Sequence, residues 1–209
     1  MSLVSQVTLV PAEFTLVKFD ADQVRGYIAE MIAAVKLSSD VSVTVEVDEV
    51  LPHPLTASTV EIIDGSVVLW FTGGCFESPQ RQTGLSPENT RVELGTSLFR
   101  ALDRLSPAFA DAPSDEDLDE RQRTIWDTYA EGRVARLGVA VRVPRRRYIF
   151  RLYAGFNDIA DAAFDRLWSS DGLTWADLAA MAEQLAAADT RPQRRKSLRS
   201  ESLRRTITA

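Results

Sequence analysis

Residues 60–71 of the chain read VEIIDGSVVLWF. Two apolar runs flank Asp64 and Gly65, a pair that adopts the positive backbone angles of a tight turn at little cost. The stretch therefore predicts a β-hairpin, and a sheet that contains it is at least partly antiparallel. Just upstream, residues 41–48 read VSVTVEVD, in which valines alternate with polar residues. This period of two is typical of a strand with one buried face.

Upstream of these strands, the sequence predicts a helix and a less regular segment. Apolar residues fall at helical spacing over residues 22–37, and an aspartate at the start of this segment can accept hydrogen bonds from the first amides. Residues 3–10 and 14–19 alternate loosely and are separated by Pro11. They predict two short strands or one interrupted edge strand.

Downstream of the hairpin the chain becomes mostly helical. Residues 77–89 are polar and predict a loop. A helix is expected over about 87–105, because Ser86 can cap it and Pro87 suits its first position. The acidic stretch 111–120 then predicts a solvated surface link into a second helix. That second helix is marked by Ile125, Trp126, Tyr129, Val134 and Leu137.

The last structured part of the sequence contains one ambiguous segment and two clear helices. Residues 139–143 and 148–153 are apolar runs separated by Pro144-Arg145-Arg146-Arg147, which predicts a hairpin or strand pair, with a helix as the alternative. Helices are expected at about 158–169 and, after a Thr174-x-x-Asp177 start typical of a capping box, at about 175–188. The residues expected to point inward from the first of these helices are Ile159, Ala162, Ala163, Phe164 and Leu167.

This order of elements, strands and one helix followed by helices, predicts an α+β fold. We expect a partly antiparallel sheet with several covering helices in a single domain over residues 1–190. Residues 191–209 hold seven basic residues and one acid, and too few apolar residues to form a core. They predict a mobile basic tail, or a short helix that forms on a partner.

Composition places the chain among ordinary globular proteins. It has 209 residues, of which 45% are hydrophobic and 26% charged. No apolar run approaches the roughly 20 residues of a membrane-spanning helix, and no secretory signal pattern opens the chain. Cys75 is the only cysteine, which excludes an intramolecular disulfide and fits a reducing compartment. The sequence thus predicts a soluble cytoplasmic protein that does not bind membranes.

The chain has a single histidine, His53, which excludes the common histidine-dependent zinc and triad chemistries unless they recruit this residue. His53 lies between Pro52 and Pro54, so we expect it in a loop. Cys75 follows two glycines at the end of a predicted strand, where a thiol can be presented at a turn. A hydrolase that uses Cys75 with His53 is therefore one alternative, and a buried cysteine beside a plain loop histidine is the other.

Residues 92–96, Val92-Glu93-Leu94-Gly95-Thr96, resemble the HELGH form of the zincin metallopeptidase helix with both histidines replaced. The resemblance implies a sheet whose edge strand receives peptide, followed by this helix. It also implies a third ligand position on a later helix, which Glu131 in WDTYAEGR would match. Because Val92 and Thr96 replace the zinc ligands, we expect no metal, no cofactor and no zinc peptidase activity. The alternative to the zincin resemblance is an ordinary amphipathic helix, in which the apolar residues pack against the core and Glu93 is solvated.

Two groups of charged residues remain as candidate sites. Glu93, Glu131, Asp127 and Asp103 form an inward carboxylate cluster if two helices face each other, and a hydrolase using Glu93 and Glu131 is a further alternative. The basic cluster Arg142, Arg145, Arg146, Arg147 and Arg151 is interleaved with aromatic residues, as in nucleic-acid surfaces. The tail adds Arg194, Arg195 and Lys196. Together these basic residues are the candidates for binding a partner.

The charge distribution favours a protein or peptide partner over nucleic acid. The net charge is −6, but residues 191–209 carry +6, so the first 190 residues carry −12. An acidic body repels nucleic acid at long range, whereas the basic tail attracts acidic partners. The sequence therefore predicts a non-catalytic interaction or regulatory domain on a degenerate zincin-like scaffold. Nucleic-acid binding and hydrolysis remain the alternatives.

Overall fold

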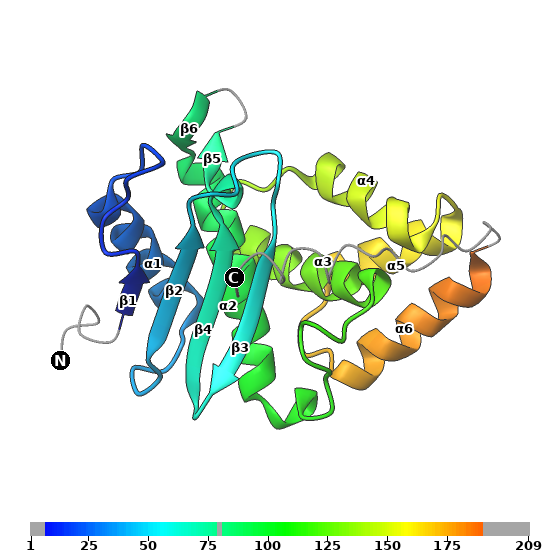
Figure 1. Cartoon of the computed structure of the whole chain (residues 1–209). Helices are drawn as coiled ribbons and strands as arrows, with labels where there is room; N and C mark the ends of the chain where they lie inside the picture. Colours follow the sequence, from blue (N-terminus) through cyan, green and yellow to red (C-terminus); the bar gives the residue numbers. More distant parts are fainter. Residues whose placement is uncertain (1–6, 79–80, 190–209) are drawn as a thin grey trace.

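The computed structural model describes residues 7–78 and 81–189 and shows a mixed sheet beside a group of helices (Figure 1). The predicted α+β class is confirmed. Strands β1 (Val7–Val10), β2 (Val43–Asp48), β4 (Ser66–Thr72) and β3 (Ser58–Ile63) lie side by side in that order. The pairs β1–β2 and β2–β4 are parallel, whereas β3 pairs antiparallel to β4 at the edge. The hairpin turn at Asp64 and Gly65 has φ angles of 49° and 78°, as its sequence predicts.

The prediction of a strand over residues 14–19 is wrong, and that of residues 3–6 lies outside the described part of the chain. The segment forms only an isolated bridge between Lys18 and Gly84. A distant side chain binds the amides of this segment. Glu49 Oε2 accepts hydrogen bonds from the N–H groups of Thr15 at 2.8 Å and Leu16 at 2.6 Å. A side chain therefore replaces the neighbouring strand that the sequence pattern requires.

Two helices that the sequence predicts cover one face of the sheet. Helix α1 (Ala21–Val35) is capped by Asp20, which accepts from the Gln23 amide, and α2 (Pro87–Leu105) is capped by Ser86. The expected loop over residues 77–89 is wrong in part, because a small hairpin of β5 (Glu77–Ser78) and β6 (Arg81–Leu85) precedes α2. A single 3-10 turn, Gly73–Cys75, connects β4 to this hairpin.

Four helices form the second half of the molecule: α3 (Glu120–Arg136), α4 (Val143–Ala154), α5 (Asp158–Ser169) and α6 (Trp175–Ala188). The strand pair predicted around residues 139–153 is wrong, and the helical alternative is right. Pro144 lies in the first turn of α4, where its missing N–H costs nothing, and Phe150 and Ala154 are buried one turn apart. The capping box at Thr174 and Asp177 is confirmed.

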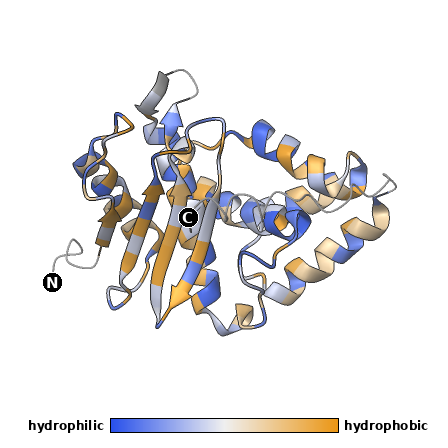
Figure 2. Ribbon diagram, viewed as in Figure 1, coloured by the Kyte–Doolittle hydropathy of each residue, from blue (hydrophilic) through white to orange (hydrophobic). Residues whose placement is uncertain are grey.

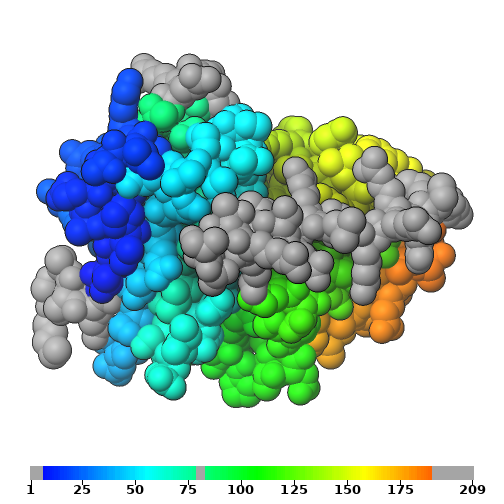
Figure 3. Space-filling view, viewed as in Figure 1, coloured from blue at the N-terminus to red at the C-terminus, as the bar shows by residue number. Residues whose placement is uncertain are grey.

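Apolar side chains form two core clusters. One lies between the sheet and helices α1 and α2, and the strands that contribute to it are among the most apolar elements in Figure 2. The other surrounds Trp126 among α3, α4, α5 and α6. In the space-filling view of Figure 3, the blue-to-cyan sheet half lies against the green-to-orange helical half. None of the described helices combines the length and hydropathy of a membrane-spanning segment.

Contrary to the sequence prediction, not every apolar residue of α5 points inward. Phe164 and Leu167 are fully buried, but Ile159 is 57% exposed and Ala162 is also exposed. The reason is that α5 packs against α3 and α4 and only lightly against α6, so its first turn keeps an uncovered apolar side. This leaves an apolar surface on the described chain.

Substitution of two helical glycines, Gly132 of α3 and Gly26 of α1, tests how tightly α3 packs against α5. A Cβ on Gly132 would lie 2.5 Å from the Trp168 carbonyl oxygen, so Gly132→Ala should lower the free energy of unfolding by about 1–3 kcal/mol. Gly26→Ala is the matched control, because no atom lies within 4 Å of its Cβ position. It should raise stability by about 0.5–1 kcal/mol through helix propensity. Urea unfolding of both variants measures the difference, and equal effects would contradict the packing described.

Candidate functional site

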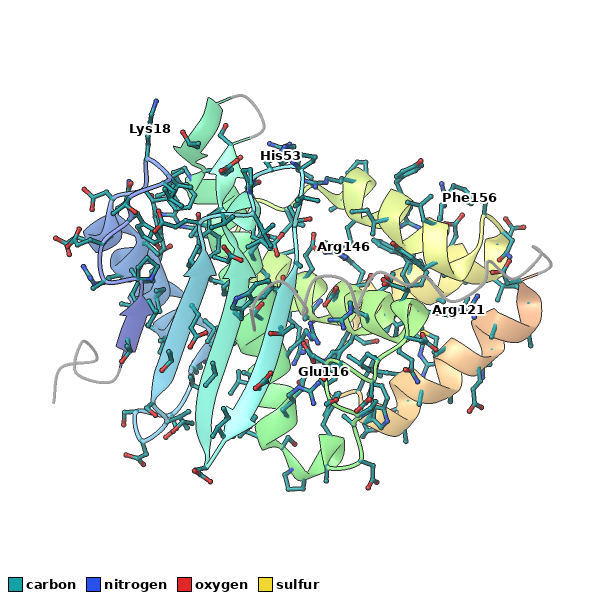
Figure 4. The ribbon with its side chains drawn as sticks, viewed as in Figure 1. Lys18, His53, Glu116, Arg121, Arg146 and Phe156 are labelled. Carbon is teal, nitrogen blue, oxygen red and sulfur yellow. The ribbon has the colours of Figure 1, made fainter. Side chains whose placement is uncertain are left out.

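Three of the four predicted cluster carboxylates meet around one arginine. Arg146, in the first turn of α4, forms an ion pair with Glu131 of α3, and the two side chains are 16% and 6% exposed. Glu93 of α2 and Asp127 of α3 lie close enough to interact electrostatically with both. Figure 4 shows Arg146 between α4 and the edge of the sheet, below the His53 loop. One guanidinium thus serves several carboxylates.

Small residues allow the helices that carry these acids to approach closely. A Cβ on Gly95 would lie 2.8 Å from Met31 Cε of α1 and 2.9 Å from Val134 Cγ2 of α3. The three helices therefore touch at this glycine. Because Gly95 lies near Glu93 on α2, and Val134 lies near Glu131 on α3, this contact brings the two carboxylates to the same end of the helix pair.

Burial shifts the proton affinity of this cluster. Desolvation raises the pKa of Glu93 to about 7, against the opposing effect of Arg146 and with a further rise from Glu131 and Asp127. Desolvation also raises the pKa of Glu131, while Arg146 lowers it. Arg146, with a smaller contribution from Arg145, therefore does not fully offset the burial of Glu93 and Glu131.

Val92 and Thr96, which the resemblance compares with histidines, carry no side chain that binds metal well. Val92 is half-buried, and Thr96 is buried with no hydrogen-bond partner for its Oγ1 within the described structure. No group of three or more histidine, cysteine, aspartate or glutamate residues suited to a metal ion is found within residues 7–78 and 81–189.

Cys75 and His53 lie in neighbouring segments, but they do not form a nucleophile and base. Cys75 is buried, and its Sγ lies 3.3 Å from the Ala57 carbonyl oxygen and 3.5 Å from Thr72 Oγ1. Burial, with a smaller contribution from Glu93, raises the pKa of the thiol to about 12. The His53 side chain is exposed, and its backbone N–H donates to Glu77 Oε2 at 3.0 Å. A buried, protonated thiol weighs against the cysteine hydrolase alternative.

Asp103, the fourth acid of the predicted cluster, belongs to a different group of contacts. Its carboxylate accepts from Arg133 and, at 2.7 Å, from the indole Nε1–H of Trp126. Ten residues of α2 separate Asp103 from Glu93, which is about 15 Å along the helix axis, so the two carboxylates meet different residues of α3. The carboxylate cluster is therefore smaller than the sequence suggested.

Asp115 is a central residue that the sequence analysis did not single out. The acidic stretch 111–120 is largely exposed, but Asp115 is only 3% exposed, so the predicted solvated link is wrong at this position. Asp115 forms ion pairs with Arg100 at 2.6 Å and with Arg104. Burial acts to raise its pKa, but these two guanidiniums outweigh it and hold the pKa below its usual range. Two arginines one turn apart on α2 were the signal that could have revealed this acid.

Most of the predicted basic surface is neutralised within the protein. Arg146 pairs with Glu131, Arg147 with Asp161 and Asp165, and Arg151 with Asp161. Arg142 and Arg145 are exposed, and the tail residues Arg194, Arg195 and Lys196 lie outside the described residues. Of the five predicted arginines around α4, this arrangement leaves Arg142 and Arg145 without an ion pair within the described residues, which weakens the case for nucleic-acid binding there.

Comparison of the chain with protein-family models, with curated proteins and with solved structures finds no match. No relative therefore assigns a role to any residue. The function must be argued from the geometry of the Arg146 cluster and of the sheet edge beside it.

Replacing Glu93 tests the electrostatics of the cluster. A carboxyl whose pKa is raised on folding stabilises the fold while protonated, and this contribution is lost as pH rises from about 4.5 through about 7. Glu93→Gln, which stays neutral, should exceed the wild type in unfolding free energy by on the order of 1 kcal/mol at pH 8. The difference should vanish near pH 4.5. Denaturant unfolding across this range measures it, with Glu61→Gln as the control for loss of one surface charge, and a pH-independent difference would contradict the shift.

Proposed function

We propose that this chain is a non-catalytic domain that binds an extended protein segment, on a degenerate zincin-like scaffold in which an arginine has taken the place of the metal. The observation that carries the proposal is the Arg146–Glu131 ion pair beside Glu93. In the resemblance noted at Val92–Thr96, Glu131 matches a metal ligand and Glu93 the acid that acts on metal-bound water. A fixed positive charge lies next to both acids.

The order and direction of the elements support the same scaffold. The resemblance implies a sheet with an accessible edge strand, then the helix that carries Glu93, then a helix with a ligand position. The chain has the antiparallel edge strand β3, then α2 with Glu93, then α3 with Glu131. Helix α2 lies against both β3 and α3. The order of these elements and the contacts of α2 are features of the backbone, so they do not depend on the side chains of Val92 and Thr96.

A guanidinium preserves the architecture of such a site without its chemistry. It compensates buried carboxylates and donates hydrogen bonds, so it keeps Glu131 and α4 in place. It has no vacant coordination position and does not generate a nucleophilic hydroxide from bound water, which is what zinc supplies in peptidases. The site is therefore suited to holding a chain segment and not to cleaving it.

The edge of β3 is the surface that fits an extended partner. The Val60 N–H points away from β4 and donates to Asp115 Oδ2 at 2.9 Å. Because antiparallel pairing alternates, the amides of Ser58 and Ile62 point the same way. The hydrogen bond from Val60 to Asp115 occupies the middle of the strand edge. A partner strand would therefore pair near Ser58, on the side of the His53 loop. Exposed Arg145, which interacts with Glu93 and Glu131, favours an acidic residue in the partner.

Restoring the missing ligands tests the scaffold. The variant Val92→His/Thr96→His/Arg146→Ala should bind Zn²⁺ with a dissociation constant of about 1 µM or lower, because two histidines one turn apart and Glu131 would then surround a vacated position. Competition with a chromophoric chelator measures the affinity. The wild-type chain should show no Zn²⁺ binding in the same competition experiment. Adding Glu131→Gln is the matched control and should weaken binding at least about tenfold. A folded triple variant that fails to bind zinc, or whose binding ignores Glu131, contradicts the scaffold.

Blocking the strand edge tests the binding mode. Ser58→Pro removes one outward amide and leaves the β3–β4 hydrogen bonds intact. In a screen against immobilised random decapeptides, the wild-type chain should retain sequences with acidic residues, and Ser58→Pro should reduce their affinity at least about tenfold. Glu61→Ala, on the face of the same strand, is the control and should bind as the wild type does. Equal binding by Ser58→Pro would place the partner elsewhere, and retention of no decapeptide would contradict extended-segment binding.

A further inference from the structure

An apolar groove lies between helices α5 and α6, away from the Arg146 cluster. It encloses about 420 Å³, and its apolar lining is formed by Ile159, Ala162, Ala163, Met181 and Leu185. Ile159 is 57% exposed, as is the nearby Phe156. Large apolar side chains that gather along one groove usually mark a contact surface. No described segment of the chain covers this groove.

We propose that the groove binds residues 190–209 of this chain, the basic segment that follows α6. The first reason is position. Helix α6 ends at Ala188, and Gln184 and Leu185 of its last turns line the groove. The segment therefore leaves the described structure at one end of the groove. Its twenty residues would span about 30 Å as a helix, enough to turn back along α5 and α6.

Charge is the second reason, because the helix pair and the basic segment carry formal net charges of equal size and opposite sign. Residues 157–189, which include α5 and α6, contain seven acids and one base, a balance of −6. Residues 191–209 carry +6. Several of the acids already pair with arginines of α3 and α4. Asp158, which lines the groove, and exposed Glu183 beside it form no ion pair within the described structure. They are the carboxylates available to the basic segment.

The apolar residues of the segment provide the third reason. Leu203 and Ile207 are four residues apart, so a helix there would present both on one face. Arg204 and Arg205 lie next to Leu203 and can reach an acidic rim. The groove offers an apolar floor and acidic edges, and the segment offers the complementary pattern. Docking would cover Ile159 and place basic side chains beside Asp158 and Glu183 without a second protein.

Disulfide trapping in the full-length chain tests this contact, because buried Cys75 does not compete for exposed thiols. The groove pair is Leu203→Cys with Gln184→Cys, and the control pair is Leu203→Cys with Ile63→Cys, an exposed site on β3. In a glutathione redox buffer, the effective concentration of the groove pair should exceed that of the control pair at least about tenfold. Adding Asp158→Lys and Glu183→Lys should reduce this excess at least about threefold, because both new charges repel the segment.

Other results of the same experiment overturn the proposal. Equal effective concentrations for the two pairs would mean that the segment does not prefer the groove. Disulfides mainly between two chains, seen as dimers on a non-reducing gel, would assign the groove to a second copy. An excess that survives both lysine substitutions would remove the charge argument. Far-UV circular dichroism of each variant establishes that the fold is retained, and none of these results depends on the proposed function of the β3 edge.

Discussion

The carboxylate of Asp115 connects three elements that share no continuous stretch of backbone. It accepts from the Val60 amide of the edge strand and forms ion pairs with Arg100 and Arg104 of α2, and Arg100 also reaches Asp127 of α3 at 3.2 Å. Buried charges are stable only when they are paired and hydrogen-bonded, so removing one partner leaves the others uncompensated. The sheet edge, α2 and α3 are therefore held in one relative arrangement.

The Arg146 cluster depends on that arrangement. Glu93 and Glu131 come from α2 and α3, and they meet because the helices approach at Gly95 and because Asp115 and Arg100 fix the same helix pair further along. Arg146 then adds α4 to the assembly through its ion pair with Glu131. The candidate site is thus an electrostatic connection between helices α2, α3 and α4. Such a connection suits a domain that holds a partner in place.

The two proposed contacts use different physical forces and lie on different parts of the molecule. The β3 edge offers the outward backbone amide of Ser58, and α4 contributes the exposed charge of Arg145. The α5–α6 groove offers apolar area with acidic residues beside it. If the basic segment occupies the groove, it also masks part of the acidity that keeps other acidic chains away. By reducing this repulsion, the contact in the α5–α6 groove would favour binding of an acidic partner at the β3 edge, although the two surfaces are separate.

The sequence by itself determined the local elements and the inventory of reactive side chains, with one histidine and one cysteine. Alternating valines, the Asp64-Gly65 turn and the caps at Ser86 and Thr174 act over a few residues, so they could be interpreted without neighbours. Only the tertiary structure decided that residues 143–154 form a helix, that Asp115 is buried and that Arg146 faces Glu131. Each of these outcomes depends on which distant groups compensate a charge or cover an apolar face. A linear pattern does not contain that information, because burial and pairing are properties of the packed chain.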